Sequence, residues 1–290
     1  MRVLVTGASG TVGSLVVPRL IERGATVRAL SRDPAHRVFP EGVEPVEGDL
    51  ERPATLDDVF DGVDAVMLYP HPETAEEVVD RIRNAGARRI VLISSASVQT
   101  APGADTEHNH GHQHHRPVEE AVERSGLEWT HLRGGEFMVN DLDSFPDSVR
   151  AEGMVRAPRG DEPGAPVHEA DMADMAAATL LEDGHHGRAY EITGPESLTP
   201  AQRTEVISLA LGREITFVPL TLAEARELWL ARGVPPELCD WLLWEPGPED
   251  DGTDSDPTPD EYVSPDYQRV IGRPGRTYAQ WVADHLDAFR

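Results

Sequence analysis

The sequence predicts an α/β fold in which a doubly wound parallel sheet is followed by a smaller α/β C-terminal lobe. Two observations lead to this prediction. Short apolar or β-branched segments alternate with segments of helical periodicity through the first half of the chain, and a glycine-rich turn directly follows the first apolar segment. Repeated strand–helix order places parallel strands in one sheet with helices on both faces. At 290 residues, the chain is long enough to bury a core without metal ions or disulfides.

The elements expected in the first half follow one another in strand–helix order. Strands are predicted over residues 2–6, 26–30, 43–47, 65–69, 89–94 and 128–132. Helices are predicted over residues 12–23, 54–60, 74–85 and 117–125. Gly24 and Gly86 come directly after two of these helices, where glycine commonly ends a helix, and Pro117 is tolerated in a first helical turn.

The second half has a different organisation. Helices are expected over residues 171–181, 200–211, 222–232 and 278–289, and strands over residues 189–193 and 215–218. Residues 245–261 hold eight acidic residues and no basic one, which predicts a mobile acidic loop. We therefore expect a first domain over residues 1–155 and a smaller substrate-binding lobe over residues 156–290, with some later segments returning to the first sheet.

Composition excludes several functions. All 26 basic residues are arginine, so Schiff-base lysine chemistry, a phosphate-loop lysine and a Tyr–Lys catalytic pair are excluded. A net charge of −26 argues against nucleic acids and anionic membranes as partners. A single cysteine, Cys239, indicates a reducing compartment. No secretory leader or long apolar span is expected, so the chain is predicted to be soluble and cytoplasmic. A monomer or a homodimer is expected.

The glycine-rich turn is the strongest local signal for a ligand. It lies between the first strand and the first helix, with Gly7 for the tight turn, Gly10 for close approach to a pyrophosphate, and Gly13 for close helix–strand packing. The N-terminus of the helix offers free N–H groups to phosphates. A Rossmann-type dinucleotide site is therefore predicted, with contacts from Gly7, Ser9, Gly10, Thr11, Val12 and Gly13.

The choice between NADP(H) and NAD(H) is predicted from the end of the second strand. Sites that prefer NAD(H) usually carry an acid there for the ribose hydroxyls. Ser31 and Arg32 instead suit a 2′-phosphate, because a guanidinium pairs with phosphate oxygens through two hydrogen bonds. NADP(H) is therefore expected rather than NAD(H), although Asp33 lies close by and could shift that preference.

Short segments in a characteristic order run through nearly the whole chain. They are Thr6 to Gly13, Gly48-Asp49-Leu50, Ser94 to Ser97, Ser125 to Arg133, Glu136 to Asn140, Asp171-Met172-Ala173, Tyr190 to Glu196 and Gly272-Arg273-Pro274. In this order the chain resembles the atypical short-chain dehydrogenases of the NmrA-like group, near the NAD(P)H:quinone reductase-like members. The resemblance implies that the cofactor is contacted by Asp49, Leu50, Tyr69, Pro70 and Ser94, and the substrate by Phe137, Met138 and Asn140.

The catalytic residues are harder to assign, because the familiar short-chain dehydrogenases use a Ser and a Tyr-x-x-x-Lys pair. Ser95 stands where that Ser would be, but the pair is replaced by His115 and Glu119. A histidine can donate a proton near neutral pH, and a glutamate one helical turn later would raise its pKa. His115 is therefore a candidate acid; alternatively, it only packs near the cofactor. Arg133 suits a phosphate or acid contact and a structural salt bridge equally.

A histidine run precedes this position. His108, His110, His112, His114 and His115 could bind Zn²⁺ or Ni²⁺, but no cysteine or ordered carboxylate pattern completes a site, so no functional metal is expected. The run could instead line the substrate entrance.

Together these features predict an NADPH-dependent reductase that transfers hydride from the nicotinamide to a small carbonyl or quinone-like compound. Two alternatives stay open. One is a non-catalytic redox sensor that binds NADP(H), which the missing Tyr–Lys pair favours. The other is a redox-neutral biosynthetic enzyme, such as an isomerase, cyclase or lyase, on the same fold.

Overall fold

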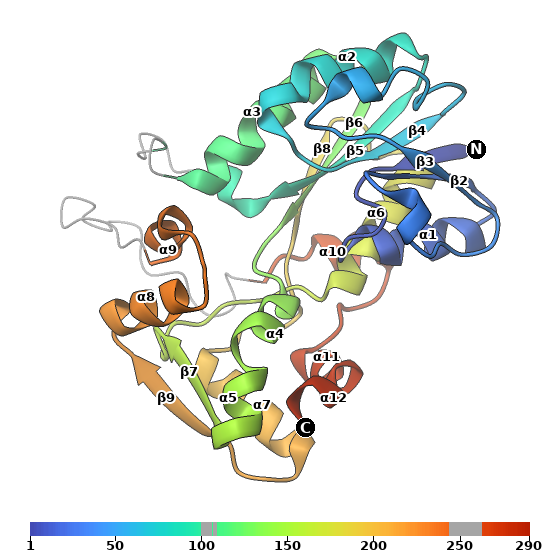
Figure 1. Cartoon of the computed structure of the whole chain (residues 1–290). Coiled ribbons are helices and arrows are strands. Elements are labelled where there is room, and N and C mark those ends of the chain that lie inside the picture. Colours follow the sequence, from blue (N-terminus) through green and yellow to red (C-terminus); the bar gives the residue numbers. More distant parts are fainter. Residues whose placement is uncertain (100–105, 107–108, 244–262) are drawn as a thin grey trace. The chain divides into compact units, whose positions relative to one another are not determined.

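The computed structural model describes residues 1–99, 106, 109–243 and 263–290 (Figure 1). The chain forms two compact units. Unit 1 comprises Met1–Gly135, Glu169–Ile192 and Asp266–Pro274, and unit 2 comprises Glu136–His168, Thr193–Pro265 and Gly275–Arg290. The predicted acidic loop lies outside the described residues. The division into a cofactor domain and a substrate lobe at residue 155 stays a prediction.

Unit 1 is built on a parallel sheet of seven strands, which confirms the predicted Rossmann-type fold. The strands are β1 (Arg2–Val5), β2 (Thr26–Ser31), β3 (Val43–Glu47), β4 (Ala65–Leu68), β5 (Arg89–Ser95), β6 (Glu128–Gly134) and β8 (Arg188–Ile192). Their order in the sheet is β3-β2-β1-β4-β5-β6-β8, and every neighbouring pair is parallel. The strand order reverses between β1 and β4, and ligands of such sheets bind beyond the carboxyl ends of the strands at that point.

Helices cover both faces of this sheet (Figure 1). On one face, α1 (Gly13–Glu22) packs against α6 (Glu169–Leu181). On the other, α2 (Ala75–Asn84) and α3 (His110–Arg124) bury a shared apolar core that includes Val78, Val118 and Val122. The short helix α10 (Asp266–Ile271) packs on α6 and β8, where Arg273 donates to Asp174 at 2.6 Å.

The prediction of a helix over residues 54–60 is wrong. Only a 3₁₀ turn, η2 (Pro53–Thr55), forms there, followed by turns. The reason lies on β2, where the buried guanidinium of Arg28 donates through Nη1 to the carbonyl oxygens of Val59 at 2.7 Å and Asp61 at 3.2 Å. These carbonyls are held toward the strand instead of along a helix axis. Three further 3₁₀ turns are η1 (Pro34–His36), η3 (Pro72–Thr74) and η4 (Ala96–Val98).

Helix α3 begins earlier than predicted. It starts at His110 instead of Pro117, because the Asn109 side chain accepts a hydrogen bond from the His112 N–H at 2.9 Å and so caps the helix. Pro117 therefore lies inside the helix.

Unit 2 combines a two-stranded parallel sheet with short helices. Its strands are β7 (Met154–Pro158) and β9 (Thr216–Leu220). Its helices are η5 (Met138–Asn140), α4 (Asp141–Ser144), α5 (Pro146–Glu152), α7 (Pro200–Leu211), α8 (Leu222–Ala231), α9 (Pro236–Leu242), α11 (Tyr278–Asp284) and α12 (Leu286–Phe289). Tyr278, Trp281 and Phe289 are fully buried in its apolar core. Among the helices of the described residues, none has the length and apolar character to span a membrane.

Candidate functional site

The glycine-rich turn joins the carboxyl end of β1 to α1. Gly7 has a φ of +61°, a backbone conformation that favours glycine, and its carbonyl oxygen accepts the Gly10 N–H at 2.9 Å. A Cβ on Gly13 would lie 2.2 Å from that same oxygen, and a Cβ on Gly10 would lie 3.2 Å from it. The turn therefore brings the N-terminus of α1 as close to β1 as the backbone permits.

This turn fits the pyrophosphate of a dinucleotide. The first N–H groups of a helix have no acceptor within the helix, and they carry the positive end of its dipole. Gly7, Ser9, Gly10 and Thr11 are exposed, so the backbone of the turn is open to a ligand. An anion can bind here without a lysine, because the backbone supplies the donors.

The end of β2 offers a cation for a further phosphate. Arg32 is exposed, and it forms no salt bridge with any residue that the structure describes. The neighbouring acid, Asp33, already has a partner, because its Oδ2 lies 2.8 Å from Nδ1 of His36. Ser31 is buried, and its hydroxyl oxygen accepts the Asp33 N–H at 3.2 Å. The arrangement leaves the guanidinium of Arg32 available to a 2′-phosphate.

Asp49 and Leu50 follow β3 at the same edge of the sheet. The Asp49 carboxylate accepts the Glu51 N–H at 3.1 Å and Nε of Arg52 at 3.0 Å. Burial opposes the charge of Asp49, but these two hydrogen bonds, with the charges of Arg52 and Arg32, hold its pKa below the ordinary value. Asp49 is therefore a carboxylate at neutral pH, able to accept a hydrogen bond from a base or a ribose.

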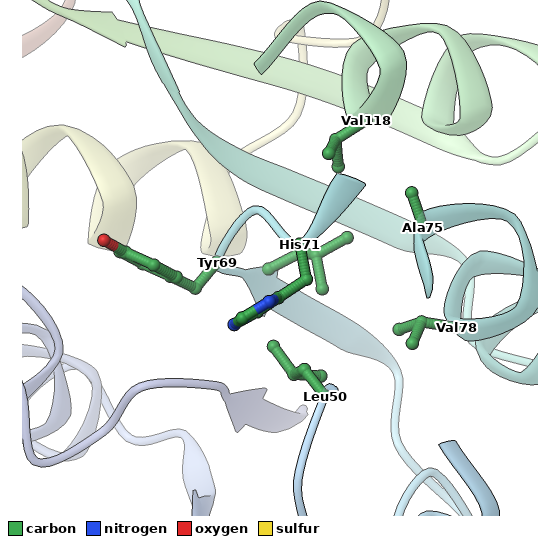
Figure 2. A pocket seen from close by; sticks show the side chains of 7 residues that line it. Leu50, Tyr69, His71, Ala75, Val78 and Val118 are labelled. Atoms are coloured by element: carbon green, nitrogen blue, oxygen red, sulfur yellow. The ribbon is translucent and has the colours of Figure 1, made fainter. Parts of the chain in front are cut away.

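Tyr69 and Pro70 follow β4 and lie beside the glycine turn. The hydroxyl of Thr6 accepts the Tyr69 N–H at 2.7 Å and donates to the Met67 carbonyl at 2.9 Å, which joins the ends of β1 and β4. A Cβ on Gly7 would lie 3.8 Å from Cβ of Tyr69. The Tyr69 side chain is half-exposed, and its ring points away from Ala75 (Figure 2). This link through Thr6 was not predicted, although a threonine directly after a buried strand is a sequence cue for such a bond.

A small pocket opens on the α2–α3 face of β4. It is lined by Leu50, Leu68, Tyr69, His71, Ala75, Val78 and Val118 (Figure 2). Two of the predicted cofactor contacts, Leu50 and Tyr69, meet here. The lining is mostly apolar, with one imidazole and one phenol, and the space between these side chains is about the size of one water molecule.

The end of β5 carries two serines with different surroundings. Ser94 is buried, and its hydroxyl donates to Oε1 of Glu119 at 2.7 Å. Ser95 is half-buried, and its hydroxyl oxygen accepts the backbone N–H of Ser97 at 3.2 Å and the Ser97 hydroxyl at 2.8 Å. The side chain of Ser94 is thus engaged inside the protein, and the cofactor contact predicted for it stays a prediction.

Glu119 acts on His115 in the predicted direction, because its charge raises the pKa of that imidazole, but the effect is too small to outweigh burial. The pKa of His115 is lowered to about 4, mainly by burial and also by nearby His114, and Glu119 only partly opposes them. The Glu119 carboxylate is taken instead by Ser94 and by Arg133, whose Nη2 donates to it at 2.8 Å. Within the described residues, Nδ1 of His115 is buried without a hydrogen-bond partner. With this pKa, His115 is neutral at pH 7, which disfavours an imidazolium acid at this position; the catalytic role predicted for His115 stays a prediction.

The predicted substrate contacts belong to unit 2. Met138 is buried in the apolar core of that unit, and its N–H donates to the Val167 carbonyl at 2.9 Å. Phe137 is half-buried, and Asn140 is exposed. Packing within unit 2 accounts for Met138, and substrate contact for these three residues stays a prediction.

The histidine run forms the start of α3, apart from His108, which lies outside the described residues. In the described part of the chain, the side chains close enough together to hold a metal ion are instead Glu119, Glu123 and His131. Guanidinium groups already bind both carboxylates of that cluster, so it is poorly suited to a cation.

The features along this edge of unit 1 define a dinucleotide-binding protein of the Rossmann class. The chain belongs to the NAD(P)H-binding family, whose model matches residues 7–183. It is 37% identical to the (4-alkanoyl-5-oxo-2,5-dihydrofuran-3-yl)methyl phosphate reductase of Streptomyces griseus, over 99% of both chains. It is 30% identical to the NAD(P)H azoreductase of Xenophilus azovorans, also over 99% of both chains.

Solved structures agree with this assignment. The NADPH complex of quinone oxidoreductase QOR2 from Escherichia coli superposes with a TM-score of 0.80 at 25% identity, covering 98% of this chain and 99% of that one. The predicted resemblance to NmrA-like proteins and quinone reductases is confirmed, because both kinds of protein share this fold.

Proposed function

We propose that this chain is an NADPH-dependent reductase of a small acceptor whose double bond is conjugated to carbonyl groups, such as a quinone or an unsaturated ketone. The observation that carries the proposal is the glycine turn. Its backbone is exposed, and Gly13 lies so close to the Gly7 carbonyl oxygen that only glycine fits there. The named reductases among the relatives match this chain over nearly its full length, which supports a reductase.

The cofactor preference rests on charge. Arg32 is exposed and unpaired within the described residues, while Asp33, the acid that would favour NADH, is engaged by His36. NADPH, when bound, supplies the hydride. The chain's own residues bind and orient it: Arg32 holds the 2′-phosphate, the turn from Gly7 to Gly13 holds the pyrophosphate, and Asp49 accepts a hydrogen bond on the adenosine side.

The class of acceptor follows from the proton donors. Hydride addition to a simple ketone produces a strongly basic alkoxide, which needs a proton from a well-placed acid. Among the residues of unit 1 that the structure describes, neither His115 nor Glu119 is such an acid: His115 is neutral, Glu119 is a carboxylate held by Arg133, and the chain has no lysine. Hydride addition to a quinone or a conjugated dicarbonyl leaves a stabilised anion instead, which solvent can protonate.

The name of the Streptomyces relative describes an acceptor of this kind, because a dihydrofuranone that carries an alkanoyl group has its ring double bond conjugated to two carbonyls. We therefore favour a conjugated lactone or quinone over a simple ketone as the substrate of this chain.

The test is a fluorescence titration of the purified protein with NADPH and NADH, followed by turnover with three acceptors: a quinone, an acyl butenolide and a simple aliphatic ketone. We expect tighter binding of NADPH, and its oxidation by the first two acceptors only. Binding without oxidation by any acceptor would favour a sensor or a redox-neutral enzyme. Absence of binding would contradict the proposal altogether.

A further inference from the structure

A buried carboxylate ties together three elements of unit 1 at the carboxyl end of the sheet. Glu119 of α3 is fully buried. Its Oε1 accepts the Ser94 hydroxyl of β5 at 2.7 Å and Nε of Arg133 of β6 at 3.0 Å. Its Oε2 accepts Nη2 of Arg133 at 2.8 Å and Nη1 of Arg116 at 3.2 Å. The carboxylate therefore holds β5, β6 and α3 by four hydrogen bonds with charged or hydroxyl donors.

This cluster lies next to the last residue of β5. Ser94 pairs in register with Arg133, and Ser95 pairs with Gly134 at the end of both strands. Because side chains alternate along a strand, Ser94 points toward α3, while Ser95 points to the opposite side. Any shift of Ser94 therefore moves Ser95, the side chain predicted to stand beside the nicotinamide.

Stability alone does not explain a charged cluster at this place. Replacing a buried ion pair by apolar side chains of similar volume is often neutral or stabilising, whereas removing one partner is costly. Directional hydrogen bonds differ from apolar contacts in one respect that matters here: they fix the position of a backbone to a fraction of an ångström. The strand end next to the cofactor is where such precision has a use.

We propose that Glu119 and Arg133 are positioning residues, which act through Ser94 to set the carboxyl end of β5, and with it Ser95, against the reacting half of bound NADPH. This inference rests on the proposed function. The sequence suggested that Glu119 acts on His115. The proposal instead gives Glu119 a role between α3 and the sheet.

The chain contains a second ion pair on this sheet that serves as a control. At the opposite, amino end of the sheet, Arg89 of β5 and Glu128 of β6 pair in register, and Nη2 of Arg89 donates to Oε2 of Glu128 at 3.0 Å. Arg89 is buried, and it also donates to Asp183 and to the carbonyl oxygens of Leu180 and Glu182, while Glu128 is partly exposed. Glu128 and Arg133, the members of the two ion pairs on β6, are five residues apart, which separates them by about 16 Å.

The experiment compares two double variants with the wild type. Glu119→Leu with Arg133→Met removes both charges at the carboxyl end together, and Arg89→Met with Glu128→Leu does so at the amino end. For each protein we would measure thermal unfolding, the Kd of NADPH by fluorescence, and kcat and KM with a quinone. Arg116 keeps Glu120 and Glu123 as partners in the first variant, so no guanidinium is left unpaired there.

The expected result is a loss of kcat of at least tenfold in the carboxyl-end variant, with the Kd of NADPH changed less than threefold, because the turn and Arg32 still hold the rest of the cofactor. The amino-end variant should keep its kcat within twofold. Equal kcat in the two variants would show that the cluster is structural only. A wild type that does not oxidise NADPH would instead overturn the proposed function.

A milder variant covers the case in which the double substitution prevents folding. Ser94→Ala removes one hydroxyl and leaves the Glu119–Arg133 pair intact. We expect a severalfold lower kcat with an unfolding temperature close to that of the wild type. An unchanged kcat in this variant would contradict positioning through Ser94.

Discussion

Asp141 in unit 2 offers the sharpest test of the electrostatics, because its carboxyl group is buried at the start of α4. The Tyr278 hydroxyl of α11 donates to its Oδ2 at 2.6 Å, and Nη1 of Arg203 of α7 lies 3.8 Å from the same oxygen. The pKa of Asp141 is raised from an ordinary value of 3.8 to about 7, mainly by burial; Arg203 and Tyr278 oppose this rise, and nearby Glu136 adds to it.

The size and sign of the effect on stability follow from linkage. As the pH rises from about 4 to about 7, an unfolded chain releases the Asp141 proton while the folded chain keeps it. The folded state therefore loses stability by about 1.4 kcal/mol per pH unit, or about 4 kcal/mol across this window, and the contribution is constant above it. The stability that this carboxyl group provides is thus fully present below pH 4 and lost as the pH passes through 7.

The substitution Asp141→Asn removes the ionisation but keeps an oxygen that can accept the Tyr278 hydroxyl. We expect the free energy of unfolding of the variant, relative to the wild type, to rise by several kcal/mol between pH 4 and pH 8. Urea unfolding at five pH values measures this difference, and calorimetry at the same pH values provides a second measurement. Asp143→Asn, at an exposed position on the same helix, is the control. A difference between Asp141→Asn and the wild type that is the same at every pH would refute the reasoning.

Three further predictions concern unit 1. Gly13→Ala should weaken NADPH binding at least tenfold in a fluorescence titration, because its Cβ would lie 2.2 Å from the Gly7 carbonyl oxygen; binding that stays intact would contradict the assigned site. Arg32→Ala should raise the Kd of NADPH by about 10- to 100-fold, the worth of hydrogen bonds between charged groups, and leave that of NADH unchanged. Arg37→Ala, also exposed, should change neither constant. His115→Gln should leave the shape of the kcat profile between pH 6 and 8 unaltered, because the pKa of His115 is about 4; loss of a titration near pH 6.5 would restore His115 as an acid.

The sequence was sufficient for the features of the fold that local patterns determine. Buried strands such as β5 are continuous apolar runs, and the turn after β1 needs glycine at positions where a Cβ would collide with backbone. Local patterns could not predict contacts between residues that are distant in the sequence. Arg28 holds carbonyls some thirty residues further along the chain, so a segment with helical spacing does not form a helix.

The candidate site shows the same limit. A helical spacing of four residues correctly places His115 and Glu119 on one helix, and it suggested that they interact. Glu119 bonds with Arg116 on its own helix, but its other partners are on β5 and β6, and only the assembled sheet brings Ser94 and Arg133 to that carboxylate. A charged residue near the end of a largely buried strand, such as Arg133 on β6, is the sequence cue that such a partner exists.

The order in which segments contribute to the two units has a consequence for biosynthesis. The chain passes between units 1 and 2 five times, at residues 135, 168, 192, 265 and 274. Strand β6 therefore keeps one edge unpaired on a nascent chain until β8 has left the ribosome, and α10 is added later still. No single cut in the gene would yield either unit as a continuous fragment, so the sheet that carries the glycine turn is completed only when most of the protein has been synthesised.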